Sequence, residues 1–260
     1  MIKNKSKAKS SKERIEQESK YLLDDRTNFF IREAYKTLRT NVEFSIPDKE
    51  GCKVITVTSS MQSEGKSITG SNLALSYARA DKRTVIVDCD LRRPKLSRLF
   101  SIRAKVGLTD VFLDPSKLDE AINHFGNTGL DLIAAGSIPP NPSELLGSAR
   151  MQKILDQLKQ RYDYVILDTP PVNMVTDSVI LANMSDGVLF VVRAMRSERG
   201  SVVHAVDQLS YAKVKILGFV LNGVEQAGGL YGKYKGYGRY GYYGKKYGYG
   251  YGSQGESGGE

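Results

Sequence analysis

One loop of the sequence has the residue types and spacing of a phosphate-binding site. The segment S-S-M-Q-S-E-G-K-S covers residues 59–67 and lies directly after a predicted strand and directly before a predicted helix. In such a position, backbone N–H groups and the helix N-terminus converge on phosphates, a lysine adds a positive charge, and a hydroxyl can bind Mg²⁺. The expected chemistry is binding of a magnesium nucleotide by residues Ser63, Glu64, Gly65, Lys66, Ser67 and Ile68.

The loop departs from the standard pattern at its first position, where Ser60 replaces glycine. A G-K-S tripeptide also occurs by chance in many loops, and taken alone it would favour no function. The strand before the loop and the helix after it favour the nucleotide interpretation, because a phosphate-binding loop needs both.

Two aspartates end the next apolar segment, V-I-V-D-C-D-L-R-R-P at residues 85–94. Side chains alternate along a strand, so Asp88 and Asp90 point to the same side, where their charges repel unless a cation or a proton compensates them. For a single aspartate, capping of the next helix or an ion pair with Arg92 or Arg93 would be the better interpretation. For the pair, one helix after a phosphate loop, a metal-binding and catalytic role is favoured. The two arginines can guide a substrate, hold a phosphate or form ion pairs.

A third carboxylate, Asp168, ends the apolar segment Y-V-I-L-D-T-P-P at residues 164–171. This is the form of a second magnesium-supporting carboxylate in P-loop nucleotide hydrolases. Ligands of an open parallel sheet gather at the carboxyl ends of its strands. Asp168 is therefore expected to lie at one site with Asp88, Asp90 and the phosphate loop, whose Ser67 hydroxyl can bind Mg²⁺.

The elements that must position these residues follow from the apolar pattern. Short apolar runs bounded by turn residues predict strands at 52–59, 84–88, 130–135, 162–168, 186–192 and 215–222, and helical periodicity lies between them at 66–80, 117–125, 143–160 and 199–211. With the phosphate loop, this alternation predicts an α/β fold of the P-loop NTPase kind, with a mostly parallel central sheet and helices on both faces.

The net charge of +9 is concentrated at the ends of the 260-residue chain. Residues 1–20 carry seven Lys/Arg and three Glu, and residues 229–260 carry five and two. Basic ends suit membrane headgroups or nucleic acid, although a solvated tail is the more common explanation. We expect a polar arm, an N-terminal helix, a P-loop domain and a flexible tail at 1–28, 29–46, 47–228 and 229–260.

The tail is rich in tyrosine and glycine. It contains nine of the fifteen tyrosines, at Tyr231, Tyr234, Tyr237, Tyr240, Tyr242, Tyr243, Tyr247, Tyr249 and Tyr251. Such mixtures also occur in RNA-binding and self-associating segments. Attachment to a nucleotide site favours a substrate role instead. A coil of about 30 residues spans roughly 30 Å, so the tail can reach its own site or a neighbour's.

Other residue types exclude several classes of site. Cys52 and Cys89 are not spaced for a disulfide framework or a zinc site, which fits a reducing cytoplasm. His124 and His204 are isolated, and we assign neither a catalytic role. No apolar run has the length of a membrane span, so any membrane association is expected to be peripheral or through a partner.

The phosphate loop, V-I-V-D-C-D-L-R-R-P and L-D-T-P-P together resemble the bacterial tyrosine kinases of capsule and exopolysaccharide synthesis, relatives of the partitioning and septum-site ATPases. The segments G-S-I-P-P-N-P-S-E-L-L at 136–146 and E-A-Y-K-T-L-R-T-N at 33–41 are also similar to that family. The resemblance covers roughly residues 30–225. It implies a kinase that uses ATP and Mg²⁺ and phosphorylates its own tail tyrosines.

Carried over by position, the resemblance assigns a role to each candidate residue. Lys66 binds phosphate, and Asp88 accepts the proton of the tyrosine hydroxyl. Ser67, Asp90 and Asp168 hold the metal. Asn222 is similar in position to a residue that contacts adenine in related ATPases, and turn formation before Gly223 is the alternative.

The resemblance also implies assembly. A Glu-x-x-Arg-x-x-Arg helix joins subunits of the family into a ring, and here it reads Glu33, Lys36, Arg39. Lysine keeps the charge but loses bidentate geometry, and a solvated helix face is the alternative. The implied partners are a transmembrane activator of polysaccharide export, a second copy phosphorylated in trans, and other protein substrates, with no nucleic acid. The implied location is cytoplasmic, at the inner face of the membrane through that activator.

Two other functions remain open. One is a partitioning-type ATPase, although such proteins carry a second lysine early in the phosphate loop and residues 59–63 contain none. The other is a nucleic-acid-binding module that uses both basic ends, whose affinity would fall steeply with salt.

Overall fold

The computed structural model describes residues 19–47 and 50–224, and within them seven strands form one sheet in the order β3-β4-β2-β5-β1-β6-β7. All neighbouring strands are parallel except β3, which runs antiparallel to β4. The strands are β1 Lys53–Ser59, β2 Thr84–Asp88, β3 Ile122–Phe125, β4 Leu130–Ile133, β5 Tyr164–Asp168, β6 Gly187–Arg193 and β7 Ile216–Asn222. The predicted α/β fold with a mostly parallel sheet is confirmed.

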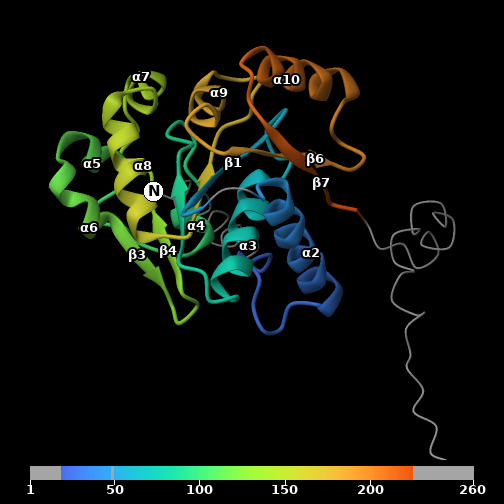
Figure 1. Cartoon of the computed structure of the whole chain (residues 1–260), viewed down its shortest axis with the longest axis horizontal. Helices are drawn as coiled ribbons and strands as arrows, with labels where there is room; N and C mark the ends of the chain where they lie inside the picture. The colour runs from blue at the N-terminus through green and yellow to red at the C-terminus, as the bar shows by residue number, and fades with distance from the viewer. Residues whose placement is uncertain (1–18, 48–49, 225–260) are drawn as a thin grey trace, which may run out of the picture. The chain divides into compact units, whose positions relative to one another are not determined.

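Helices cover both faces of this sheet. They are α2 Phe29–Ser45, α3 Lys66–Ala78, α4 Leu96–Leu99, α5 Leu108–Leu113, α6 Leu118–Ala121, α7 Pro142–Leu146, α8 Ala149–Arg161, α9 Asp177–Ala182 and α10 Arg199–Tyr211, with a short 3₁₀ turn at Pro115–Lys117. Figure 1 shows α2 beside α3 on one side, and α5, α6 and α8 on the other. Two apolar clusters lie on the two faces, which explains why β2 and β5 are buried at every position and mostly apolar.

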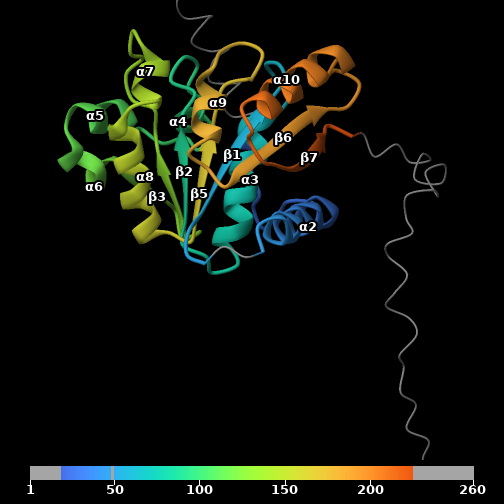
Figure 2. The same ribbon diagram turned by 45° about the horizontal axis from the view of Figure 1, so that its top comes forward.

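The central strands place the candidate site residues at one edge of the sheet. Every residue of β2 and β5 is buried, and their register pairs Asp88 with Asp168. β1 lies on the other side of β5 and leads into the predicted phosphate loop. Figure 2 shows β2, β5 and β1 side by side with α3 packed across them. Parallel pairing therefore brings the residues after three separate strands together.

One predicted helix is wrong in its second half. The segment 117–125 forms a helix only to Ala121, and Ile122–Phe125 then pair with Leu130–Ile133 as an antiparallel edge strand. The helical periodicity in this stretch is short, and pairing with β4 satisfies the backbone groups that the helix would have bonded. The predicted helix at 143–160 is also interrupted, at Gly147 and Ser148.

The predicted polar arm at residues 1–28 is wrong at its C-terminal end. Leu22 and Leu23 are buried in the cluster that contains α3. The amide of Asn72 on α3 donates to the carbonyl of Tyr21 and accepts from Leu23 N, both at 2.8 Å. Two apolar side chains and one buried amide thus hold this segment in place. Residues 1–18 and the predicted tail at 229–260 lie outside the described residues.

The helix predicted at 29–46 is present as α2. Its first turn is capped by the side chain of Asn28, which accepts from Phe30 N at 2.8 Å, and it ends just before Pro47. Of the helices that the structure describes, none is long and apolar enough to cross a membrane.

Candidate active site

The predicted phosphate loop connects β1 to α3 and is shaped by left-handed backbone. Ser63 and Gly65 have φ values of 65° and 99°. A Cβ on Gly65 would lie 1.8 Å from Nδ2 of Asn222, which donates to the carbonyl of Glu64 at 2.9 Å. Only glycine fits at position 65, because both the backbone angle and the space exclude a side chain.

The side chain of Glu64 points into the loop and bonds to its other residues. It is 2% exposed, and its carboxylate accepts from the hydroxyl of Ser60 at 2.9 and 3.0 Å and from Met61 N at 2.8 Å. The hydroxyl of Ser197, from the loop after β6, donates to the same carboxylate. Ser60 therefore has a structural use in the position where the standard pattern has glycine.

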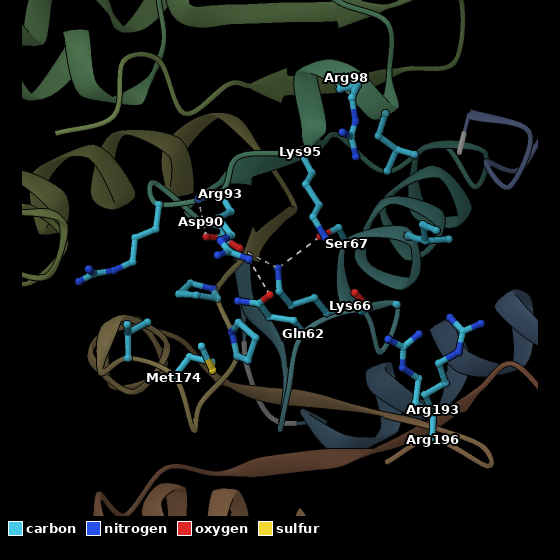
Figure 3. A pocket seen from close by; sticks show the side chains of 18 residues that line it. Gln62, Lys66, Ser67, Asp90, Arg93, Lys95, Arg98, Met174, Arg193 and Arg196 are labelled. Atoms are coloured by element: carbon cyan, nitrogen blue, oxygen red, sulfur yellow. Dashed lines mark hydrogen bonds and ion pairs between the residues drawn. The ribbon is translucent and has the colours of Figure 1, made fainter. Parts of the chain in front are cut away.

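Lys66 lies between two carboxylates at the start of α3. Its Nζ is 3.2 Å from Asp90 Oδ2 and 3.3 Å from the hydroxyl of Ser67 (Figure 3). It is also 3.5 Å from Asp168 Oδ1. Burial alone lowers the pKa of Lys66, but Asp168 and Asp90 outweigh it and raise the pKa. Lys66 is thus a buried, permanently charged ammonium group whose present partners are carboxylates.

Asp168 has one oxygen without a partner. Its side chain is fully buried, and Oδ2 makes no hydrogen bond. Burial raises the pKa of this carboxyl, although Lys66 opposes the shift. A buried acceptor without a donor is uncommon, and a cation or a bound water is the usual explanation.

The residues predicted for Mg²⁺ fit a site that nucleotide phosphates would complete. No group of three or more Asp, Glu, His or Cys side chains with metal-binding geometry occurs among the described residues. Mg²⁺ bound to a nucleotide usually takes one or two carboxylates, with phosphates and waters as its other ligands. Asp90, Asp168 and Ser67 supply that smaller set, since all three surround the Lys66 ammonium group.

Asp88 faces helix α4 instead of the cavity. Its Oδ2 accepts from the backbone N–H groups of Lys95 and Leu96, both at 2.9 Å, and Oδ1 accepts from Asp90 N at 3.3 Å. Burial, followed by the neighbouring Asp168 carboxylate, raises the pKa of Asp88 to about 7. This is the helix-capping geometry that the sequence offered for a single aspartate, so the catalytic role of Asp88 stays a prediction.

The two arginines after Asp90 have different partners. Arg92 forms an ion pair with Asp177, and Arg93 Nη1 donates to Gln62 Oε1 at 2.7 Å. The sequence left three roles open for Arg92, namely guiding a substrate, holding a phosphate and forming an ion pair. In the structure Arg92 forms the ion pair.

A cavity of about 630 Å³ opens beside Lys66, a suitable size for a small-molecule ligand. Figure 3 shows basic side chains around it from several segments, with Met174 on another side. The apolar part of its wall contains Pro171, Met174 and Val175. The basic part contains Lys66, Arg92, Arg93, Lys95, Arg98, Arg193 and Arg196. Such a cavity can bind an anionic ligand and an apolar group side by side.

Most predicted nucleotide residues line this cavity, and others lie apart. Ser63, Gly65, Lys66, Ser67 and Ile68 are in its wall, whereas the carboxylate of Glu64 is turned into the loop. Asn222 lies over Gly65. The sequence interpretation missed Ser197 and Met174, because nothing in the local pattern relates them to a loop more than 100 residues earlier.

The predicted oligomerisation residues lie on α2, outside the cavity wall. Lys36 Nζ is 2.7 Å from Glu33 Oε1, and both side chains are exposed. Arg39 Nη1 donates to the carbonyl of Ser76 at 2.6 Å, so it holds α2 against α3. All nine predicted phosphoacceptor tyrosines lie outside the described residues.

Comparison with known proteins points to one group of enzymes. A family model described as an AAA domain matches residues 52–216. The tyrosine-protein kinase YwqD of Bacillus subtilis is 38% identical over 209 residues, which cover 80% of this chain and 86% of that protein. The tyrosine-protein kinase CpsD of Streptococcus agalactiae is 36% identical over 208 residues, covering 80% and 90%.

Solved structures agree with these relatives. The kinase domain of the Escherichia coli tyrosine kinase ETK has 34% identity and a TM-score of 0.72, covering 75% of this chain and 76% of that one. The septum-site-determining protein MinD of Pyrococcus horikoshii, in complex with Mg-ADP, has 20% identity and a TM-score of 0.56, covering 65% and 70%. The second likeness extends to the fold alone.

Proposed function

This chain belongs to the bacterial tyrosine-protein kinases, and we propose that it transfers the γ-phosphoryl group of ATP to tyrosines of its own C-terminal segment, in the service of capsule or exopolysaccharide synthesis. The observation that supports this most is the position of Lys66. Its ammonium group lies between Asp90 and Asp168, at the start of the helix that follows the phosphate loop. The ammonium group of Lys66, the phosphate loop and the carboxylates of Asp90 and Asp168 thus lie together.

In this proposal Lys66 changes its partners from the two carboxylates to the nucleotide phosphates. It neutralises Asp90 and Asp168 in the structure, and it would turn to the β- and γ-phosphates when the nucleotide enters. Mg²⁺, held by Ser67, Asp90 and Asp168, would then neutralise those carboxylates and the transferred group. The backbone N–H groups of residues 63–68 complete the phosphate site. Little further chemistry is needed beyond holding the acceptor in line.

We propose Asp88 as the acceptor of the tyrosine proton. A pKa raised to about 7 suits a base that works near neutral pH. The carboxylate is occupied by the N–H groups of Lys95 and Leu96, so one of these contacts has to open before a phenol can be reached. The base role therefore requires a small movement of the first turn of α4.

The apolar wall of the cavity suits an aromatic acceptor. Met174 is 48% exposed, lines the cavity and lies in a segment that is hydrogen-bonded to the end of β1 and the start of α10. Val172 N donates to the carbonyl of Ser59 at 2.9 Å, and Asn173 Nδ2 donates to the carbonyl of Ser201 at 2.8 Å. A tyrosine ring can pack on a methionine sulfur, a contact that favours phenols over smaller hydroxyl groups. We propose this wall as the place of the tyrosine ring.

Partners follow from the same proposal. We propose that a transmembrane protein of polysaccharide export activates the chain and holds it at the inner face of the membrane. We also propose that copies associate through the α2 face with Glu33, Lys36 and Arg39, and that tail tyrosines are phosphorylated between copies. Other protein substrates would compete for the same cavity.

Mass spectrometry of residues 229–260 from the native host tests the function. We expect phosphotyrosine in the wild-type tail and none in a Lys66→Met strain, because the phosphates lose their buried cation. Lys82→Met is the control, since Lys82 is exposed and precedes β2, at the end of the strand away from Asp88. An unmodified tail in both wild type and control, under polysaccharide-producing conditions, would refute the proposed acceptor and favour a partitioning-type ATPase role.

A further inference from the structure

An ion pair with a buried aspartate holds the loop that follows β2. Arg92 Nε and Nη2 donate to Asp177 Oδ2 and Oδ1, at 2.9 and 3.2 Å. The hydroxyl of Ser143 donates to Asp177 Oδ1 at 2.6 Å and accepts from Arg92 Nη2 at 2.9 Å. The Asp177 side chain is fully buried, whereas that of Arg92 is 39% exposed. We call Arg92, Ser143 and Asp177 the Arg92 clamp.

The clamp joins three segments that are distant in the sequence. Arg92 is two residues after Asp90, Ser143 lies on α7, and Asp177 begins α9. Ser143 belongs to the segment 136–146. The proposed sites for the nucleotide and for the acceptor tyrosine give this segment no role. A buried carboxylate is costly unless it is paired and hydrogen-bonded, so these three side chains have to stay together.

A short turn connects the clamp to the candidate metal site. Asp90 Oδ1 accepts from Arg93 N at 3.1 Å, and its carbonyl accepts from the same N–H at 3.1 Å. Asp90 Oδ2 faces Lys66. The direction of the Asp90 carboxylate is therefore set by the turn 90–93, and the place of that turn is set by the guanidinium group of Arg92.

The geometry also argues against a phosphate-binding role for Arg92. Two of its nitrogen atoms are used by Asp177, and one of these also donates to Ser143. An arginine fork held by a carboxylate is preorganised, and lysine could not replace it at this site. With the clamp in place, the carboxylate of Asp90 points at Lys66. The clamp therefore serves to position Asp90.

We propose that the Arg92 clamp positions Asp90 for Mg²⁺, and that breaking the clamp weakens the magnesium dependence of nucleotide binding. This proposal rests on the magnesium role proposed for Asp90. Ser143, Asp177 and Arg92 are positioning residues, since they act through the turn and not on the nucleotide. Loss of partners that orient metal ligands typically lowers metal affinity about 10- to 100-fold.

The test compares nucleotide binding with and without the metal. The affinity of the full chain for a fluorescent ADP analogue is measured in MgCl₂ and in EDTA, and the ratio of the two dissociation constants is the magnesium enhancement. We expect Asp177→Asn to lower the enhancement about 10-fold and to leave the affinity in EDTA unchanged. Ser143→Ala should lower it less, and Ser143→Thr, which keeps the hydroxyl, should restore it.

Asp163→Asn is the matched control. It removes the charge of another arginine–aspartate pair, in which Arg83 Nε and Nη2 both donate to Asp163 Oδ1, at 3.2 and 2.6 Å. Asp163 lies just before β5, at the opposite end of the strands. Thermal unfolding of each variant separates lost stability from lost magnesium enhancement. The enhancement of Asp163→Asn should equal that of the wild type.

The outcomes separate this proposal from the proposed function. A normal enhancement in Asp177→Asn and Ser143→Ala, even with a lower melting temperature, overturns the clamp and leaves the kinase site intact. An absent enhancement in the wild type overturns the magnesium assignment itself, and the clamp proposal with it. An enhancement that falls equally in Asp163→Asn shows a general structural effect and also overturns the proposal.

Discussion

Replacing Asp88 by asparagine should make the stability of the protein less dependent on pH. Asp88 Oδ2 accepts from Lys95 and Leu96 at 2.9 Å, and Oδ1 accepts from Asp90 at 3.3 Å. Asparagine has one carbonyl oxygen, which can keep the two shorter bonds, while its NH2 group replaces Oδ1 and faces the Asp90 N–H, a cost that does not depend on pH. Asp88→Asn therefore preserves the cap of α4 and removes the ionisation.

The expected effect follows from the two pKa values of this carboxyl group. The pKa is about 7 in the folded protein, because of burial and then Asp168, against an ordinary value of 3.8 for an exposed aspartate. The folded state thus binds the proton more tightly than the unfolded chain. The stability that Asp88 contributes is full below about pH 4 and is lost as the pH rises to about 7. Each pH unit between these values is worth about 1.4 kcal/mol, so the ceiling is ~4 kcal/mol.

Urea denaturation measures this directly. Wild type and Asp88→Asn are unfolded without nucleotide and in EDTA, because a bound metal would favour the ionised carboxylate. The free energy of unfolding of the variant, minus that of the wild type, should rise with pH between about 4 and 7 by up to ~4 kcal/mol. A difference that is constant, or that falls as the pH rises, would refute the account of Asp88 as a carboxyl group with a raised pKa.

Two further substitutions test the loop and the acceptor wall. Gly65→Ala should lower the free energy of unfolding by more than the ~1–2 kcal/mol of left-handed backbone strain, because its Cβ would lie 1.8 Å from Asn222 Nδ2. In an Asn222→Ala background the cost in urea denaturation should fall to the backbone part, and an unchanged cost would contradict the steric argument. Met174→Ser should raise the KM for a tyrosine peptide several-fold and leave the KM for ATP unchanged, since Met174 is assigned to the tyrosine ring alone. Met195→Ser is its control in the same kinase assay, because Met195 is fully exposed and does not line the cavity; an equal rise of the peptide KM in both variants would remove the special role of Met174.

Much of the site could be predicted because its parts are local in the sequence. The loop at 59–67 is defined by the strand before it and the helix after it, and both are visible as short-range patterns. The apolar runs that end in Asp88 and Asp168 also identify themselves, since a strand buried on both faces is apolar at every position. The phosphate loop and parallel pairing together predict Lys66, Asp90 and Asp168 at one edge, and in the structure both carboxylates lie within 3.5 Å of Lys66 Nζ.

What the sequence could not reveal depends on pairs of residues that are far apart. The segment 117–125 has helical periodicity, so its edge strand was not predicted. That strand is stabilised by pairing with Leu130–Ile133. The polar composition of the first 28 residues gave no sign that Leu22 and Leu23 are buried, because they pack in a cluster with α3 and are bonded to its Asn72 amide.

The same limit applies to the direction of individual side chains. The sequence placed Asp88 and Asp90 on the same side of a strand, yet the structure turns Asp88 toward the N–H groups of α4 and Asp90 toward Lys66. It left the role of Arg92 open, and the partners that decide it, Ser143 and Asp177, are 51 and 85 residues away. Residue types and strand ends thus determined which chemistry this protein can perform. Tertiary packing decided which carboxylate faces the cavity, because a buried charge takes the direction in which its hydrogen bonds are satisfied.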